Sequence, residues 1–443
     1  MAGLRRVLRL GFAGSALCLP LAGAEAGSFY LQEQSVTGIG RANAGSVAAA
    51  QDASTIYFNP AGMTKLSGPQ VLIGGFAINP SGEVKDEGST AASPGTLGQT
   101  IGLTSSAEHP YGLEGVPNFY AAVPVKDHDI WLGLGVTVPF GLQTEYADDF
   151  FGRYDSTKSE VRTIDVSPVL AVKVTDWLSI GGGLDIQHAS AELKNALPNP
   201  LTPGGPSTAT DGEFRVQGDD TNVGFNFGIL LNPLEGTQIG VHYRSQMDHD
   251  LRGSARYSDL TGPLAFLNGT NSADAKLNLP NIVSFGLSQE LGHGVTLLGS
   301  ATWFNWERFR EIKIEGDAER GEPTSVQNYD NTWSLAVGTE YRPLPSLTLR
   351  TGFQFDQTPT RNEYRTTRIP DGDRYWLSVG ASWQATDWFT VDAAYAHIFV
   401  VSTTVDQSQT FYEGTALATT VNTRAKTANA GVDVFGLQAR FTF

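Results

Sequence analysis

The chain has 443 residues, of which 40% are apolar and 17% are charged, and it contains 50 glycines and 23 phenylalanines. Its formal net charge of −16 argues against a nucleic-acid partner, because phosphates repel an acidic surface. No apolar run of 18 residues follows the first 26 positions, which excludes membrane-spanning helices. Many aromatic and glycine residues with few charges are typical of strands that face lipid on one side and a polar lumen on the other.

The first 26 residues have the pattern of a cleaved secretion signal. Three arginines are followed by an apolar stretch at 10–21 that is too short to cross a bilayer, and residues 24–26 form an A-x-A cleavage site. The only cysteine, Cys18, lies inside this signal. We therefore expect a mature chain that begins at Gly27 and has neither a disulfide nor a cysteine metal site.

The next segment, residues 27–68, is rich in glycine, alanine and serine. It shows no sustained apolar period, so it has no face that could form a core of its own. The sequence predicts that the remainder of the chain, residues 69–443, encloses this segment as a plug or hatch.

Strict alternation of apolar and polar residues dominates the remainder of the chain. Residues 435–443 alternate up to the last position, with Phe, Leu, Ala, Phe and Phe on one face. Residues 178–186, 223–231 and 375–383 repeat the pattern. A secreted β-sandwich or propeller would also alternate, but its strands are typically five or six residues long. Runs of nine or more residues favour strands that cross a bilayer at a tilt.

Short turns and long polar loops connect these runs in alternation. An even strand number with short turns at one end and long loops at the other is typical of outer-membrane barrels. Six short turns and seven long loops predict a 14-stranded antiparallel transmembrane β-barrel. The turns fall at 126–129, 175–176, 233–236, 292–294, 343–346 and 386–387, and the loops at 81–115, 144–159, 194–219, 254–274, 315–327, 360–373 and 406–429.

Catalytic and cofactor motifs are missing from the sequence. It contains no H-E-x-x-H zinc motif, no phosphate-binding loop and no G-x-S-x-G nucleophile elbow, and its seven histidines are scattered. We therefore expect no enzyme activity, no cofactor and no metal site, although barrel enzymes that hydrolyse lipids exist.

Several motifs along the mature chain resemble the FadL family of outer-membrane long-chain fatty acid transporters. The resemblance is carried by an ordered set rather than by one match: GIGRANAG at 38–45, STIYFNPAGM at 54–63, VPN at 116–118, PFGLQTEY at 139–146, LNLP at 277–280 and IPDGDRYWLS at 369–378.

This resemblance implies a monomeric 14-stranded barrel in the outer membrane of a Gram-negative bacterium. Such a barrel would be surrounded by outer-membrane lipid and lipopolysaccharide and folded by the barrel-assembly machinery. It would move long-chain fatty acids without an energy source. Uptake of another hydrophobic compound, such as an aromatic hydrocarbon, is the nearest alternative, and a lipid hydrolase or a non-transporting receptor lies outside that class.

The resemblance also assigns roles to the hatch and to the third strand. In the family the new N-terminus, here Gly27, Ser28 and Phe29, reaches the ligand pocket, and Asn59, Pro60 and Ala61 of the hatch lie deep in the lumen. The third strand kinks inward and opens the wall sideways to the membrane. The matching strand at 130–142 carries four residues that interrupt a β-ladder, namely Gly133, Gly135, Pro139 and Gly141. Close packing against the hatch explains Gly133 and Gly135 nearly as well.

For the ligand carboxylate, the family uses basic residues near the outer ends of the fifth and ninth strands. Strand positions align Lys194 and Lys313 with them, and solvated lysines at loop bases are the alternative. The family also has an initial apolar groove on two outer loops. Here the loop at 198–205 is rich in proline and glycine, so one loop remains for this groove, with Leu260, Leu264, Phe266 and Leu267.

Overall fold

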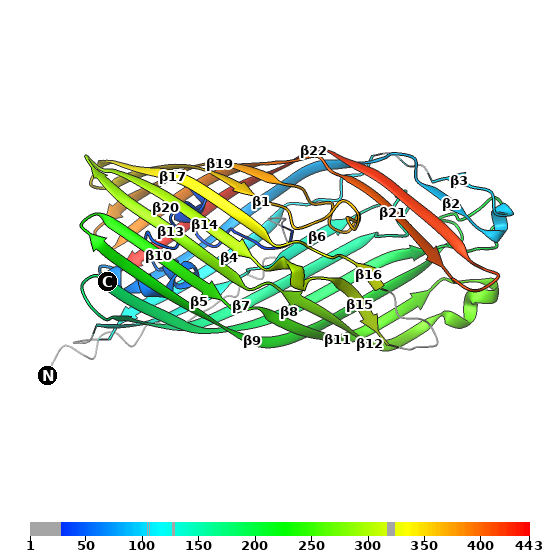
Figure 1. Ribbon diagram of the computed structural model, residues 1–443, viewed down its shortest axis with the longest axis horizontal. Coiled ribbons are helices and arrows are strands. Elements are labelled where there is room, and N and C mark those ends of the chain that lie inside the picture. The colour runs from blue at the N-terminus through cyan, green and yellow to red at the C-terminus, as the bar shows by residue number, and fades with distance from the viewer. Residues whose placement is uncertain (1–27, 104, 106, 126–128, 317–323) are drawn as a thin grey trace.

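The computed structural model describes residues 28–103, 105, 107–125, 129–316 and 324–443. Its strands tilt around the long axis of one elongated barrel (Figure 1). The described residues form a closed wall of 14 antiparallel strands, which confirms the predicted barrel. Pairing of the first wall strand with the last, from Gln70–Thr442 to Asp86–Ala425, closes it.

Eight wall strands are continuous among the described residues, and six are interrupted, so that each of the six carries two labels. The continuous strands are β1 (Gln70–Asp86), β4 (Glu114–Pro124), β7 (Lys158–Lys173), β8 (Leu178–Leu197), β9 (Gly212–Leu234), β18 (Leu347–Asp356), β19 (Arg374–Thr386) and β22 (Thr419–Thr442). The interrupted strands are β5 (Ile130–Thr137) with β6 (Gly141–Glu145), β10 (Thr237–Arg244) with β11 (Met247–Ser258), β12 (Gly269–Leu279) with β13 (Ile282–Gly292), β14 (Val295–Phe304) with β15 (Glu311–Glu315), β16 (Thr324–Val326) with β17 (Thr332–Leu344), and β20 (Phe389–Val400) with β21 (Thr404–Phe411).

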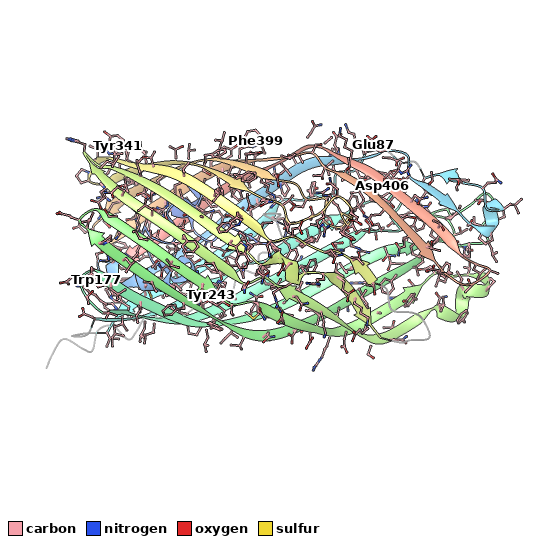
Figure 2. The ribbon with its side chains drawn as sticks, in the orientation of Figure 1. Glu87, Trp177, Tyr243, Tyr341, Phe399 and Asp406 are labelled. Atoms are coloured by element: carbon pink, nitrogen blue, oxygen red, sulfur yellow. The ribbon has the colours of Figure 1, made fainter. Side chains whose placement is uncertain are left out.

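An apolar belt surrounds the half of the barrel that carries the short turns. Outward side chains of the belt, such as Phe225 and Leu377, are each 52% exposed. Figure 2 shows Trp177 at the short-turn end and Tyr243 farther along the wall, while Asp406 lies in the half that carries the long loops. Aromatic residues on both sides of an apolar band are the arrangement expected at the two surfaces of a bilayer.

Beyond the belt the polarity of the two faces reverses. On β8, Leu193 and Leu197 turn inward and are partly or fully buried, whereas Glu192 and Lys194 lie on the outward face. On β15, Ile314 is buried and its neighbours on the strand are charged. The wall here has no lipid around it, so its apolar side chains pack inside and its charged ones face water.

Residues 28–66 of the hatch lie inside the short-turn half of the barrel (Figure 1). This part of the hatch contains only short elements: α1 (Val36–Ile39), α2 (Thr55–Phe58) and the 3₁₀ helix η1 (Pro60–Lys65). Ser35 caps α1 by accepting a hydrogen bond from Gly38 N at 3.2 Å. Because the wall buries almost every hatch residue, enclosure replaces the core that the hatch cannot build alone.

Buried ion pairs join the hatch to the wall. Arg41 of the hatch lies 2.6 Å from the Glu340 carboxylate on β17, and Arg350 of β18 lies 2.9 Å from the same carboxylate. Gln51 of the hatch donates a further hydrogen bond to Glu340. All three charged side chains are at most 7% exposed, so each charge depends on its partner.

Two strands and three short 3₁₀ helices lie outside this plan, mostly in the long loops. None of the helices in the described part of the chain is long and apolar enough to cross a membrane. The residues 146–156 between β6 and β7, expected to form a polar outer loop, instead fold inward, where Phe150 and Phe151 are buried. The additional elements are β2 (Thr90–Ala92), β3 (Ile101–Gly102), η2 (Pro94–Thr96), η3 (Gly262–Leu267) and η4 (Trp306–Arg308).

Candidate functional site

A narrow apolar cavity, here called the inner cavity, lies inside the barrel above the hatch. About 710 Å³ of space, part of it open to solvent, lies between its lining atoms. Its wall is built almost entirely of apolar side chains. They include Phe29 of the hatch, Leu142, Val161, Ala191, Leu193, Val216, Leu251, Ala273, Leu277, Phe309, Ile312, Ile314 and Ile369.

Phe29 reaches this cavity because the start of the hatch is held on two sides. Its ring packs against Trp306 at 4.9 Å and Phe309 at 5.3 Å between centroids. The backbone N–H of Ser28 donates to Asp371 Oδ2 at 3.0 Å. Gly27, predicted to share this site, lies outside the described residues. Of the three expected N-terminal residues, Phe29 therefore lines the cavity and Ser28 lies beside it.

A wider outer cavity of about 2260 Å³ lies between the long loops. It shares four lining residues with the inner cavity, namely Leu193, Ile312, Ile314 and Arg368. The two cavities are therefore adjacent, and these side chains lie at the boundary between them. A molecule that enters between the loops would pass Arg368 before it reached the apolar interior.

Arg368 is a cation with loosely held partners at this junction. Its side chain is 11% exposed, and its nitrogens lie 3.4 Å from Ser159 Oγ, 3.3 Å from Asn195 Oδ1 and 3.8 Å from Asp155 Oδ1. Burial lowers the pKa of Arg368 from its ordinary value, while the Asp155 carboxylate acts in the opposite direction. An arginine nevertheless keeps its proton, and its planar fork matches a carboxylate in two parallel hydrogen bonds.

The structure does not bring Lys194 and Lys313 to the inner cavity. Lys194 lies on the outward face of β8 and pairs with Glu213 at 3.0 Å, whereas its neighbours Leu193 and Asn195 line the cavities. Lys313 pairs with Glu315 at 3.1 Å, and the residues on either side of it line the inner cavity. The predicted role of the two lysines depends on their strand and on their distance along the barrel axis. Because successive side chains of a strand point to opposite faces, a shift of one residue places a lysine on the outward face.

The expected outer-loop groove is divided in the structure. Leu260, just before η3, and Leu264, within η3, are buried in the core of the outer half, with exposures of 3% and 4%. Leu267 lines the outer cavity, and Phe266 is 75% exposed. The four residues therefore do not form one continuous groove.

The third wall strand leaves the wall between β5 and β6. Residues 137–142 are all buried, although a wall strand alternates between its two faces. Pro139 O accepts a hydrogen bond from Leu31 N, and Gly141 N donates to Phe29 O, both at 2.9 Å. The kinked segment thus pairs with the hatch on one side, while Phe140 O still accepts a hydrogen bond from Thr163 N of β7 at 3.1 Å.

The kink leaves a gap in the ladder beside β4. Among the described residues, β4 and β5 pair only from Phe119–Val136 to Pro124–Trp131. Farther out, Glu145 N donates to Pro110 O at 3.0 Å. Between these limits the wall has no backbone ladder in the part of the chain that the structure describes.

The two predicted strand glycines lie where the wall touches the hatch. A Cβ at Gly133 would lie 2.6 Å from Met63 Sδ, and one at Gly135 would lie 3.1 Å from Ile56 Cγ2. Close hatch packing therefore accounts for Gly133 and Gly135, whereas Pro139 lies in the kink itself.

The Asn59–Ala61 turn is fixed by the wall and by its own backbone. Asn59 Nδ2 donates to Ile229 O at 3.0 Å and to Val47 O at 2.8 Å, while its Oδ1 accepts from Ala61 N at 3.2 Å. Pro60 begins η1, where its missing N–H leaves no bond unmade. All three residues are buried, and their depth in the lumen stays a prediction.

Sequence reasoning missed Arg368 and the charge cluster that follows it. Asp371 accepts from Ser28, pairs with Arg374 and is 1% exposed. Both residues belong to the motif at 369–378 that carried the resemblance, and Arg368 immediately precedes it. The loop that contains Arg368 has no hydrophobic period. Only the position of Arg368 directly before the motif could have indicated a role for it.

Comparison with known proteins identifies the family. Residues 21–443 match the family model described as outer membrane protein transport protein (OMPP1/FadL/TodX). An outer membrane protein of Neisseria meningitidis is 30% identical, over 99% of this chain and 98% of its own. The long-chain fatty acid transport protein of Escherichia coli is 26% identical, over 83% of this chain and 86% of its own.

Solved structures agree with this match. The crystal structure of a FadL homologue from Pseudomonas aeruginosa superposes with a TM-score of 0.81 and is 26% identical, over 94% of this chain and all of that one. The toluene transporter TodX of Pseudomonas putida gives a TM-score of 0.65 at 16% identity, over 88% of this chain and 94% of that one, a likeness of fold alone. The chain therefore belongs to the OMPP1/FadL/TodX family of outer membrane transport proteins, which transport hydrophobic compounds.

Proposed function

We propose that this protein takes up long-chain fatty acids, binding the tail in the inner cavity and the carboxylate at Arg368. The observation that carries the proposal is the position of Arg368, a buried cation at the outer end of an apolar cavity. An amphiphile with one acidic end needs this combination. The related fatty acid transport protein of E. coli supports the same substrate class.

The hydrophobic effect explains why such a path needs no fuel and where it must end. Burying a tail is favourable by roughly 0.8 kcal/mol per CH₂, so about 15 methylenes favour the cavity over water by about 12 kcal/mol. An exit into water would therefore trap the ligand. We propose that the ligand leaves through the gap beside the kink, directly into the lipid.

The proposed organisation follows from this path. Residues 1–26 are a signal that is removed, residues 27–68 are a hatch that closes the lumen, and residues 69–443 are the barrel. The protein acts as a monomer and as a passive channel rather than as an enzyme. The family match to transport proteins supports the last point.

Binding of radiolabelled hexadecanoic acid to the purified protein tests the carboxylate assignment. Arg368→Met removes the charge and keeps the length of the side chain, so affinity should fall roughly tenfold to a hundredfold, the value of one charge-assisted contact. The double variant Lys194→Ala/Lys313→Ala is the matched control and should bind like the wild type. Unchanged binding in Arg368→Met, or loss in the double variant, would move the carboxylate site.

An aromatic hydrocarbon is the second candidate ligand. Apart from Arg368, Lys276, Ser159 and Gln217, the inner cavity is lined by apolar residues, which an uncharged ring fits equally well. Toluene transporters share the fold. Toluene uptake by cells that carry the protein, without uptake of hexadecanoic acid, would favour this candidate.

A further inference from the structure

Two polar residues come next in the register where the ladder beside the gap ends. The last paired residues of β4 and β5 are Phe119 and Val136, so the same register places Asn118 opposite Thr137. Asn118 is 3% exposed and Thr137 is 1% exposed. The pair therefore forms the buried inner rim of the gap.

Neither side chain is satisfied there. Asn118 Nδ2, Asn118 Oδ1 and Thr137 Oγ1 have no hydrogen-bond partner among the described residues. Leaving one buried polar group unpaired is unfavourable enough that native proteins rarely do so without a reason. Three such atoms at one rim indicate a site for a ligand that supplies the missing hydrogen bonds.

A glycine on the neighbouring strand leaves room for the Asn118 amide, and a hatch side chain reaches the kink beside it. On the neighbouring β1, Gly74 lies opposite Asn118, and a Cβ at Gly74 would lie 2.8 Å from Asn118 Oδ1. On the hatch side, Gln34 Nε2 donates to Val138 O at 2.8 Å, and its Oε1 is a fourth buried atom without a partner in the described structure. Strand, kink and hatch therefore each contribute one polar group.

The kinked segment that begins at Thr137 reaches the inner cavity at its other end, Leu142. Phe29 and Leu142 line that cavity, and Phe29 O accepts the hydrogen bond from Gly141 N in the kink. A ligand that moved from the cavity toward the gap would thus pass residues 137–142. Its last polar contact before the lipid would be at Asn118 and Thr137.

We infer that Asn118 and Thr137 form an exit site that binds the carboxyl group in its neutral, protonated form. A primary amide offers one acceptor and one donor on the same side, which match the O–H and the C=O of a carboxylic acid. An ionised carboxylate has no proton for Asn118 Oδ1, and its charge is strongly disfavoured in hydrocarbon. The acid therefore takes its proton from the aqueous phase before it enters the bilayer, whereas Arg368 binds the ionised form at the entrance.

This inference rests on the proposed fatty acid transport and is tested by comparing an acid with a hydrocarbon. The probes are hexadecanoic acid and hexadecane, and the measurement is the rate of transfer from the protein into the lipid of outer-membrane vesicles. Asn118→Leu and Thr137→Val keep the side-chain volumes and remove the polar atoms. The control is Thr302→Val on β14, which lies away from the gap. The Thr302 hydroxyl donates a hydrogen bond to Ser284 Oγ at 3.1 Å.

The site predicts slower transfer of the acid alone. In Asn118→Leu, transfer of hexadecanoic acid should fall about tenfold, with binding in the lumen and transfer of hexadecane unchanged, and Thr137→Val should show a smaller loss of the same kind. Transfer of the acid by the wild type should also slow as the pH rises, while that of hexadecane stays constant.

Two results would overturn the exit site. Equal slowing of acid and hydrocarbon would mean that the substitutions only obstruct the path, and unchanged transfer of the acid would mean that its carboxyl group does not use the rim. Failure of fatty acid transport itself is read separately, because the wild type would then move hexadecane but not the acid.

Discussion

Gly133 lies so close to the hatch that its missing side chain is part of the packing. An alanine there would place a Cβ 2.6 Å from Met63 Sδ and 2.8 Å from Val169 Cγ2. Overpacking of this kind lowers the free energy of unfolding by about 1–3 kcal/mol. We therefore predict that Gly133→Ala lowers the thermal unfolding temperature of the purified barrel.

Gly115 on β4 is the matched control for this prediction. A Cβ there would meet no atom within 4 Å, so Gly115→Ala should leave stability nearly unchanged. Equal unfolding temperatures for the two variants would show that hatch packing does not require Gly133. The presence of glycine at position 133 would then have to be explained by the lateral gap and not by hatch packing.

The lysine assignment shows where residue-level prediction from sequence ends. Inside the belt an outward residue is apolar and an inward one polar, so alternation fixes the faces of residues 435–443 correctly. Above the belt the polarity of the two faces reverses, so a reading that carries the belt's rule upward assigns charged residues to the wrong face. Lys194 and Lys313 lie in this region, where they pair with Glu213 and Glu315.

At the scale of elements, the kink between β5 and β6 is the feature that separates this wall from a simple barrel. Pro139 has no N–H for a ladder, and Gly141 lacks a side chain to hold it in the sheet. We predict that Pro139→Val/Gly141→Val lets this strand pair with β4 and closes the gap. Uptake of hexadecanoic acid by cells should then fall at least tenfold, with binding to the purified protein retained. Normal uptake would argue against exit at this point.

The buried ion pairs of Glu340 with Arg41 and Arg350 lead to a second prediction, which concerns the hatch. Glu340→Gln leaves the buried charges of Arg41 and Arg350 without their carboxylate, which should destabilise the seated hatch by about 3–5 kcal/mol. Urea unfolding of the purified protein measures this loss. Asp176→Asn removes the exposed partner of Lys173 and should have no measurable effect. Equal free energies of unfolding for the two variants would mean that the Glu340 ion pairs do not stabilise the seated hatch.

At the scale of the whole molecule, the sequence determines the architecture more fully than the site. Strand alternation and the lengths of turns and loops predicted the 14-stranded barrel, because lipid, lumen and the two ends of the barrel each impose a distinct pattern. The inner cavity escaped prediction, since its lining comes from the hatch, from seven strands and from the loop that contains Arg368 and Ile369. Arg368 and Asn118 acquire their positions only when those elements meet.

The central claim for the whole molecule is that ligands leave through the wall while the hatch stays seated. Thr64 Oγ1 on η1 and Ser179 Oγ on β8 lie 2.7 Å apart, so Thr64→Cys/Ser179→Cys provides a disulfide between hatch and wall. The measurement is uptake of radiolabelled hexadecanoic acid by cells with this disulfide formed and then reduced, with Ser179→Cys alone as the control. The account predicts equal uptake in both states, and uptake that is lost on oxidation and restored by reduction would contradict it.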